Sequence, residues 1–313
     1  MYLLVIKQLV IMILIAVAGF AVTRKFKFGM QEQQFVSKVL IYFINPCLIF
    51  SRFDMDYDLE HLKTFGLVTV MSVIVHLAMI LAALIFCRSK TEEGKSLDSI
   101  DKLALVFTNC GFIGIPLIDG VFPGTQAVFY LLPFIITFNV FLWIFGYFIF
   151  CGKVNLKKLI TNPNIIAVLL GIIIFCLPFR LPQVIAAPVK SISSMNTAMA
   201  MFLLGMLFAN FHGFQKFYIG RMIKLCLLRF GLIMFISLGL VYAFYNIFGG
   251  LSDIRLICYV IFIASLCPVG MSVSSFAVLF NKDESYAGLS VLATSVVCVL
   301  TLPLSVAFAE LIF

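Results

Sequence analysis

Long apolar segments alternate with short polar ones along almost the whole chain. Each apolar segment is long enough to form a transmembrane helix, which needs roughly 20 predominantly apolar residues to cross the hydrocarbon core of a bilayer. The pattern therefore predicts an all-α polytopic membrane protein with ten transmembrane helices. The predicted spans cover residues 3–22, 34–51, 63–87, 102–119, 126–151, 164–180, 190–210, 217–247, 254–280 and 286–313.

Two of these spans contain residues that interrupt a helix. Gly111, Gly114 and Pro116 lie close together in the fourth span, and Pro268 is followed closely by Gly270 in the ninth. Non-helical backbone at membrane depth is tolerated only inside protein or beside a water-filled cavity, and paired interruptions point to a substrate site near the midplane. The predicted substrate-binding residues from these two stretches are Asn109, Cys110, Gly111, Phe112, Gly114, Pro116, Pro268, Gly270, Met271, Ser272, Ser274 and Ser275.

A polar connection from Cys151 to Asn162 divides the chain into two parts with five predicted spans each. An odd number of spans per part means that the second part enters the membrane from the opposite side, which is the inverted-repeat arrangement of many secondary transporters. We therefore expect a first five-helix repeat at residues 1–151 and an inverted second repeat at residues 152–313. The interrupted spans then occupy equivalent positions in the two repeats.

The composition supports a membrane protein and argues against several other classes. Hydrophobic residues make up 63% of the chain and charged residues 12%, and the mean hydropathy is +1.15, which is unlike a soluble domain. The net charge of +8 resides in the connections, so we expect no nucleic-acid partner. The nine cysteines show no paired CxxC spacing, and the acidic stretch 54–60 lacks the glycine and final glutamate of a calcium loop. We expect no metal and no cofactor, and the absence of a catalytic set argues against an enzyme.

The distribution of Lys and Arg predicts the orientation in the bilayer, because cytoplasmic connections are enriched in these residues. If both termini lie outside the cytoplasm, six cations lie on the outer side: Lys7, Arg52, Lys63, Arg180, Lys190 and Arg255. The other sixteen then lie on or near the cytoplasmic side: Arg24, Lys25, Lys27, Lys38, Arg88, Lys90, Lys95, Lys102, Lys153, Lys157, Lys158, Lys216, Arg221, Lys224, Arg229 and Lys282. We therefore expect a multi-pass protein of the cell membrane with both termini extracytoplasmic.

Several motifs together resemble the auxin efflux carrier family, which includes plant auxin exporters and bacterial malate-permease-like proteins. They are the fourth-span pattern from Asn109 to Leu117, Pro268 with the acidic turn at Asp283 and Glu284, and the ending Leu300-Thr-Leu-Pro-Leu304. The resemblance extends over the full chain. One departure is that Met271 and serines follow the ninth-span proline where many relatives carry an asparagine.

This resemblance implies how the two repeats are used. It implies a scaffold part, about 1–51 and 164–210, that forms a homodimer in the lipid bilayer. It also implies a transport part, about 63–151 and 217–313, that moves as an elevator and binds substrate where the fourth and ninth helices cross.

For some individual residues the sequence is compatible with more than one role. The carboxamide of Asn109 is suited either to binding a substrate carboxylate or to capping freed backbone groups. His76 shares a helical face with Thr69 and Ser72, which favours either proton coupling or a neutral ring bonded to a neighbouring helix. Asn45 and Asn196 occupy corresponding places in the two scaffold halves, where they are candidates for a fixed wall of the site.

The function predicted from these features is secondary transport of small organic anions, such as malate or auxin-like acids. No Asp or Glu lies at membrane depth near the interrupted spans to compensate a cation. The sequence leaves two rival functions open: a gated anion channel, and a sodium-coupled carrier like the bile-acid symporters.

Overall fold

The computed structural model describes residues 1–54, 58–89, 91–152, 161–177, 181–211, 215 and 218–312. Helices form nearly all of this described part, which contains no strand. They are α1 (Tyr2–Phe26), α2 (Met30–Val39), η1 (Leu40–Ile44), α3 (Asn45–Ser51), α4 (Leu59–Phe86), α5 (Glu92–Val106), η2 (Cys110–Gly114), α6 (Ile115–Val121), α7 (Ala127–Phe141), η3 (Leu142–Gly146), α8 (Tyr147–Cys151), α10 (Pro163–Phe175), α11 (Gln183–Ser194), α12 (Asn196–Asn210), α13 (Tyr218–Leu227), η4 (Leu228–Leu232), α14 (Ile233–Ile247), α15 (Ile254–Leu266), α16 (Met271–Leu279) and α17 (Glu284–Ala309), where η marks a π-helical turn.

Seven helices of the described part are long and apolar enough to cross a membrane, which confirms an all-α polytopic membrane protein. They are Tyr2–Phe26, Met30–Ser51, Leu59–Phe86, Ala127–Phe150, Gln183–Asn210, Tyr218–Ile247 and Glu284–Ala309. Three apolar helices are shorter: Cys110–Val121, Pro163–Phe175 and Ile254–Leu266. The first and last of these are halves of the two spans that the sequence predicts to be interrupted.

Two predicted starts are wrong by about two helical turns or more. The fourth span is predicted from residue 102, but its helix α5 begins at Glu92. The seventh span begins at Gln183 and not at residue 190, because the helix accommodates Pro188 in its first turns and keeps Lys190 on an exposed face. The middle connection, which the sequence predicts to be cytoplasmic, includes residues 153–160, and the acidic stretch includes residues 55–57. These two segments lie outside the described residues.

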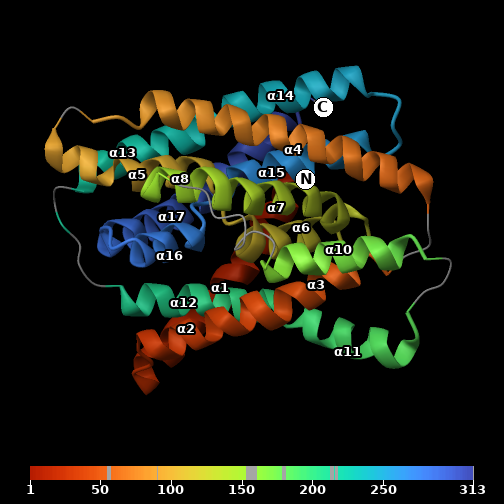
Figure 1. Ribbon diagram of the computed structural model, residues 1–313, viewed down its shortest axis with the longest axis horizontal. Coiled ribbons are helices and arrows are strands. Elements are labelled where there is room, and N and C mark those ends of the chain that lie inside the picture. The colour runs from red at the N-terminus through yellow and green to blue at the C-terminus, as the bar shows by residue number, and fades with distance from the viewer. Residues whose placement is uncertain are drawn as a thin grey trace.

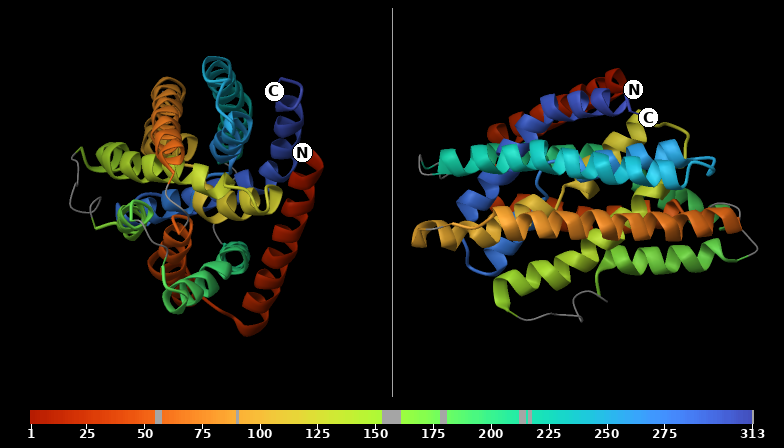
Figure 2. Two further views of the ribbon diagram at one scale, coloured as in Figure 1. Left: turned by 90° about the vertical axis from the view of Figure 1, so that its right-hand side faces the viewer. Right: turned by 90° about the horizontal axis from the view of Figure 1, so that it is seen from above.

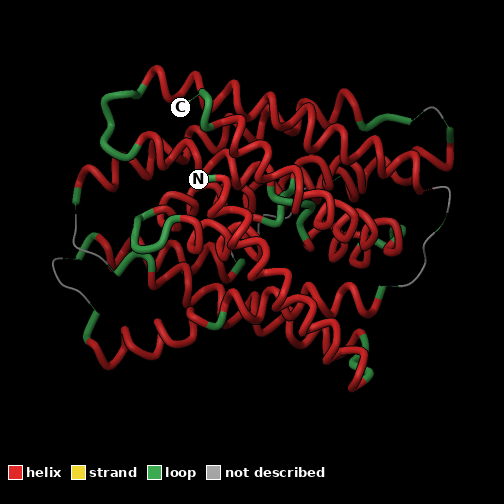
Figure 3. The backbone as a smooth tube through the Cα atoms, turned by 180° about the vertical axis from the view of Figure 1, so that it is seen from behind, coloured by secondary structure: helices red, strands yellow, loops and turns green. Residues whose placement is uncertain are grey.

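The helices form layers around the two interrupted spans. In Figure 1, α2, α11 and α12 lie on one side of the molecule and α4 and α14 on the other, and the views of Figure 2 agree. The segments α5–α6 and α15–α16 lie between these layers. Figure 3 shows that loop segments occur within the bundle as well as at its ends.

The interrupted spans cross and exchange backbone hydrogen bonds in place of helical ones. Thr108 and Val269 form an antiparallel bridge. On either side of it the Asn109 N–H donates to the Pro268 carbonyl at 2.7 Å, and the Gly270 N–H donates to the Phe107 carbonyl at 2.9 Å. These bonds satisfy backbone groups that have no helical partner, as burial away from water requires.

The helices α1 and α12 pack against each other through glycines. A Cβ atom added to Gly205 would lie 2.1 Å from the Ala16 carbonyl oxygen, and one added to Gly19 would lie 2.8 Å from the Phe202 carbonyl oxygen. Such close backbone approach is typical of membrane helices that associate through small residues.

Replacing Gly205 with Ala should therefore push α1 away from α12, because a backbone carbonyl cannot move aside as a side chain does. We expect the detergent-solubilised variant to lose about 1–3 kcal/mol of stability, measured as a lower melting temperature. Gly239→Ala is the matched control, since its added Cβ meets no atom within 4 Å. Equal melting temperatures for both variants would contradict this packing.

Candidate substrate-binding site

A cavity of about 480 Å³ lies beside the crossing of the two interrupted spans. Both breaks contribute to its wall, together with η1, α3, α7, η3, α16 and residues 161–164. Nine of the predicted site residues line it: Asn45, Asn109, Cys110, Gly111, Phe112, Gly270, Met271, Ser272 and Ser275. The structure thus brings the two predicted stretches together with one residue of the second span.

The two breaks have different local causes. Cys267 adopts an extended backbone conformation, as the residue before a proline prefers, and α15 ends there. The first break lies at residues 107–109, ahead of Gly111 and Pro116. Pro116 sits inside the restarted helix, just after the π-helical turn η2, and its carbonyl accepts a hydrogen bond from the Gln8 side chain at 3.1 Å.

Several buried polar atoms of the cavity wall have no hydrogen-bond partner in the protein. They are Asn45 Oδ1, Asn109 Nδ2, Asn164 Oδ1 and Ser272 Oγ. Asn109 is only 4% exposed and Asn45 only 5%, so these side chains are held inside the protein. Buried polar groups are normally paired, because leaving one unpaired costs about 1–3 kcal/mol. Their arrangement around one cavity indicates a polar ligand.

The rest of the wall is apolar and aromatic. Trp143 and Phe276 lie with their ring centroids 5.2 Å apart, and Phe112 and Phe138 also face the cavity. No Asp, Glu, Lys, Arg or His is among the described residues that line it. The first turns of η2 and α16 begin at this wall, and the first N–H groups of a helix lack intrahelical partners and carry partial positive charge.

A second carboxamide cluster completes the wall, and the sequence analysis did not identify it. The Asn162 Nδ2 donates to Asn139 Oδ1 at 3.1 Å, and the Asn139 Nδ2 donates to the Ile135 carbonyl at 2.8 Å. Asn162 also caps α10, because its Oδ1 accepts the Asn164 N–H at 2.9 Å. An asparagine in the middle of an apolar span, as Asn139 is, was the available signal.

Six predicted residues are not part of this wall. Gly114, Pro116, Pro268, Ser274, Asn196 and His76 are absent from the lining. Pro268 contributes instead to a separate apolar pocket of about 540 Å³ between α1, α12 and α17.

Asn196 and His76 are both buried away from this cavity. The His76 Nδ1 lies 2.8 Å from the Ser72 carbonyl oxygen of its own helix, and its ring packs between Phe134 and Phe141. This geometry is that of a structural histidine, and proton coupling through His76 stays a prediction.

Arg229 is a buried residue at the crossing. The sequence predicts it among the cations on or near the cytoplasmic side, but its side chain is fully buried. Its guanidinium donates to the carbonyls of Ala104 and Leu105, both at 2.9 Å, in the last turn of α5. It also donates to the Cys267 carbonyl at the end of α15, from Nη2 at 2.5 Å and from Nε at 3.1 Å. One side chain therefore caps both helices that end at the crossing.

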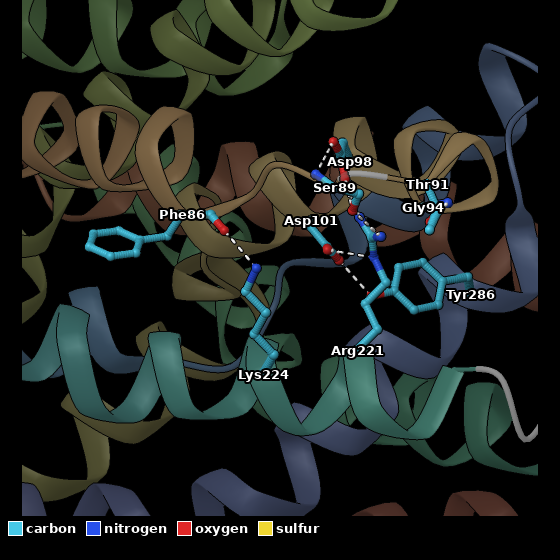
Figure 4. A network of polar contacts seen from close by, with 9 residues as sticks. All are labelled: Phe86, Ser89, Thr91, Gly94, Asp98, Asp101, Arg221, Lys224 and Tyr286. Atoms are coloured by element: carbon cyan, nitrogen blue, oxygen red, sulfur yellow. Dashed lines mark hydrogen bonds and ion pairs between the residues drawn. The ribbon is translucent and has the colours of Figure 1, made fainter.

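A second arginine organises the far end of α5 (Figure 4). Arg221 pairs with Asp98 at 2.6 Å and with Asp101 at 2.7 Å, and it donates to the Ser89 hydroxyl at 2.8 Å. The Tyr286 hydroxyl donates to Asp101 at 2.5 Å. The network joins α5, α13 and α17 with the segment that follows α4.

The two carboxylates of this network lie outside the predicted spans and differ in acidity. Burial raises the pKa of Asp101 to about 6, against the opposing effect of Arg221. Burial also acts to raise the pKa of Asp98, but hydrogen bonds from Arg221 and Ser89 outweigh it and hold that pKa below its usual value.

Replacing Arg221 with Gln should destabilise the protein more at pH 8 than at pH 5. The raised pKa of Asp101 means that ionising it costs folding stability as the pH rises through about 6, and removing Arg221 increases that cost. At pH 5 Asp101 is largely protonated in the wild-type protein, and only the pair with Asp98 is lost. We expect a loss of about 1.5–3 kcal/mol at pH 8, measured by thermal unfolding in detergent.

Lys282→Gln is the control for the Arg221 variant, because this exposed cation precedes α17 near the same network. A stability difference for Arg221→Gln that does not change between pH 5 and pH 8 would contradict the assignment of Asp101.

A comparison with family models gives an independent result. A model described as membrane transport protein matches residues 4–155 and, separately, residues 151–306. The two matches together extend over nearly the whole chain, and they meet at the connection between the predicted repeats. A comparison with curated proteins found no match.

Proposed function

The chain belongs to the membrane transport protein family, the auxin efflux carrier family that its motifs indicate, and on that premise we propose that it is a secondary carrier for small organic anions. The observation that carries this proposal is the cavity at the crossing. It combines two helix N-termini, an unpartnered buried Asn109 amide and a wall without charged side chains among the described residues.

The polarity of the cavity favours an anion over a cation. Helix N-termini stabilise a negative charge by about 0.3–2 kcal/mol, and their free N–H groups donate hydrogen bonds to it. A cationic substrate would meet no carboxylate from the described part of the wall, and burying an unpaired charge is costly.

The apolar part of the wall favours monocarboxylates with an aromatic or aliphatic body. A single carboxylate would bind between Asn109, Ser272 and the helix N-termini, while Trp143 and Phe276 would pack on the apolar body. A dicarboxylate such as malate would place its second charge against aromatic side chains, with no cation from the described residues to pair it.

We extend the proposal to the architecture. Ten spans would form two inverted repeats, and the double family match together with the two breaks supports this arrangement. The residues 1–51 and 164–210 would form the dimeric scaffold, and residues 63–151 and 217–313 would move as an elevator. With Arg229 placed in the interior, the cation distribution of the predicted orientation becomes fifteen to six and still favours extracytoplasmic termini in the cell membrane.

Transport measurements separate this carrier from the rival functions. A gated channel would show flux far above carrier turnover and no counter-transport, and a sodium-coupled carrier would stop when sodium is replaced by choline. Proton coupling through His76 would give uptake whose pH dependence flattens in a His76→Gln variant.

An uptake screen in proteoliposomes tests the substrate class. We expect purified protein to transport indole-3-acetate or benzoate faster than malate, because the cavity offers one anion site beside an apolar wall. Radiolabelled uptake with and without an excess of each unlabelled acid measures this preference. Uptake that prefers aromatic amines would contradict the proposal.

Asn109→Ala should weaken binding of the transported acid by roughly tenfold to a hundredfold, the equivalent of one lost hydrogen bond to a charged group. The half-saturating concentration for uptake measures the loss. Asn246→Ala is the control, since that exposed side chain bonds only within its own helix. An Asn109→Ala protein with unchanged affinity would show that the acid binds elsewhere.

A further inference from the structure

The two interrupted spans present opposite polarity on the two sides of their crossing. The helices α5 and α15 end there, whereas η2 and α16 begin there. A helix carries the equivalent of about half a negative charge at its C-terminus and half a positive charge at its N-terminus. The crossing thus presents about one unit of negative charge where two helices end and about one unit of positive charge at the cavity.

Arg229 lies on the negative side. Within the described residues, its hydrogen bonds go to backbone carbonyls at the ends of α5 and α15. Within the described part of the chain no carboxylate pairs with it, and the ionisable groups that surround it are the thiols of Cys110, Cys226, Cys267 and Cys298. Its charge is therefore compensated by the two helix C-termini and not by an acidic side chain.

We propose that Arg229 is a built-in counter-cation that travels with the substrate, so that the crossing loaded with a monovalent anion carries no net charge. This inference rests on the proposed carrier function and goes beyond it. Four converging carbonyls, from residues 104, 105, 265 and 267, form the kind of oxygen cage that would otherwise attract a free cation. Here the guanidinium fills that cage permanently, and the carrier needs no co-transported cation at this position.

The charge balance predicts which step of the cycle responds to membrane potential. The loaded transport part would move the guanidinium and the carboxylate together, and their charges cancel. The empty transport part would return with the guanidinium alone, and one positive charge would move through the field. Membrane potential would therefore act on the return of the empty carrier and not on the loaded step.

The other charges of the transport part do not alter this balance. No charged side chain among its described residues lines the cavity, and Arg221 is paired with Asp98 and Asp101 in a network near the first turns of α13 and α17. His76 is the remaining described ionisable side chain near mid-span apart from the thiols and tyrosines. Its one hydrogen bond, to a carbonyl, and the unpaired Nε2 fit a neutral ring.

Flux measurements in proteoliposomes test the proposal with radiolabelled indole-3-acetate, and with benzoate as a second monocarboxylate probe. Potassium gradients with valinomycin set the potential to zero or to about 100 mV, inside negative. Self-exchange, with the same acid on both sides, requires only the loaded step. Net uptake into empty vesicles also requires the empty return.

For the wild-type protein we expect self-exchange to change by less than about twofold with potential, while net uptake falls severalfold, up to a limit of about 50-fold for one charge crossing the whole field. Both fluxes should persist when choline replaces sodium. Self-exchange that responds to potential as strongly as net uptake would overturn the proposal, and this test needs no variant.

Two variants separate the charge of Arg229 from its structural role. Arg229→Met removes the charge and keeps an unbranched side chain, so self-exchange should become sensitive to potential as the loaded crossing carries the charge of the acid. Arg229→Lys keeps the charge and should retain the wild-type pattern even where affinity falls. A folded Arg229→Met protein whose self-exchange ignores potential would overturn the proposal.

The failure of the proposed function would look different. Wild-type vesicles that carry neither acid, in exchange or in net uptake, would refute the anion carrier and the counter-cation together. Wild-type vesicles that exchange an acid with a strong response to potential would refute the counter-cation alone.

Discussion

The structure depends on how backbone groups are satisfied where two helices stop inside the membrane. Each end leaves carbonyls without helical partners, and lipid offers no replacement. One guanidinium satisfies carbonyls at both ends, because Arg229 donates hydrogen bonds to Ala104 and Leu105 in α5 and to Cys267 at the end of α15. The carbonyls of Phe107 and Pro268 accept backbone hydrogen bonds across the crossing, from Gly270 and Asn109. Because one side chain bonds to both helix ends, it holds α5, α15 and η4 together at the break.

The same arrangement determines what the cavity can bind. With the negative helix ends capped by Arg229, the helix N-termini at the opposite side meet no anionic side chain among the described residues of the wall. The wall adds neutral amides and hydroxyls, among them Asn109 and Ser272. Anion selectivity of this kind would arise from backbone orientation and not from a basic residue in contact with the ligand. Under the proposed function, the site would need no basic side chain near the breaks.

The sequence predicts the breaks and one side of the cavity well, because glycine and proline clustered beside an asparagine in an apolar run weaken the helix at that point. Nine of the predicted residues do line the cavity. The role of Arg229 is not predicted from the sequence, because Lys and Arg of a membrane protein are expected in cytoplasmic connections, and its burial depends on packing against α5 and α15. Asn162 is not predicted as a cavity residue, because it belongs to a polar connection and its position depends on its hydrogen bond to Asn139. The position of the first break also differs from expectation, since Pro116 lies within α6, just after η2, and the chain unwinds earlier, at residues 107–109.

Few polar contacts would resist a movement between the proposed scaffold and transport parts. Two ion pairs join the parts at one end of the molecule, the N-terminal amine with Glu310, and Arg52 with Asp119. Such exposed pairs each contribute about 0–1 kcal/mol, so they hold the two parts together only weakly at that end. Four members of the cavity wall are exposed: Tyr42, Thr161, Ser275 and Leu279. Of these, Thr161 and Leu279 lie at or beside connections of the other end, which the cation distribution assigns to the cytoplasm. In the proposed elevator, an outward movement of the transport part would break both ion pairs at little cost while the bonds of Arg229 keep the crossing intact.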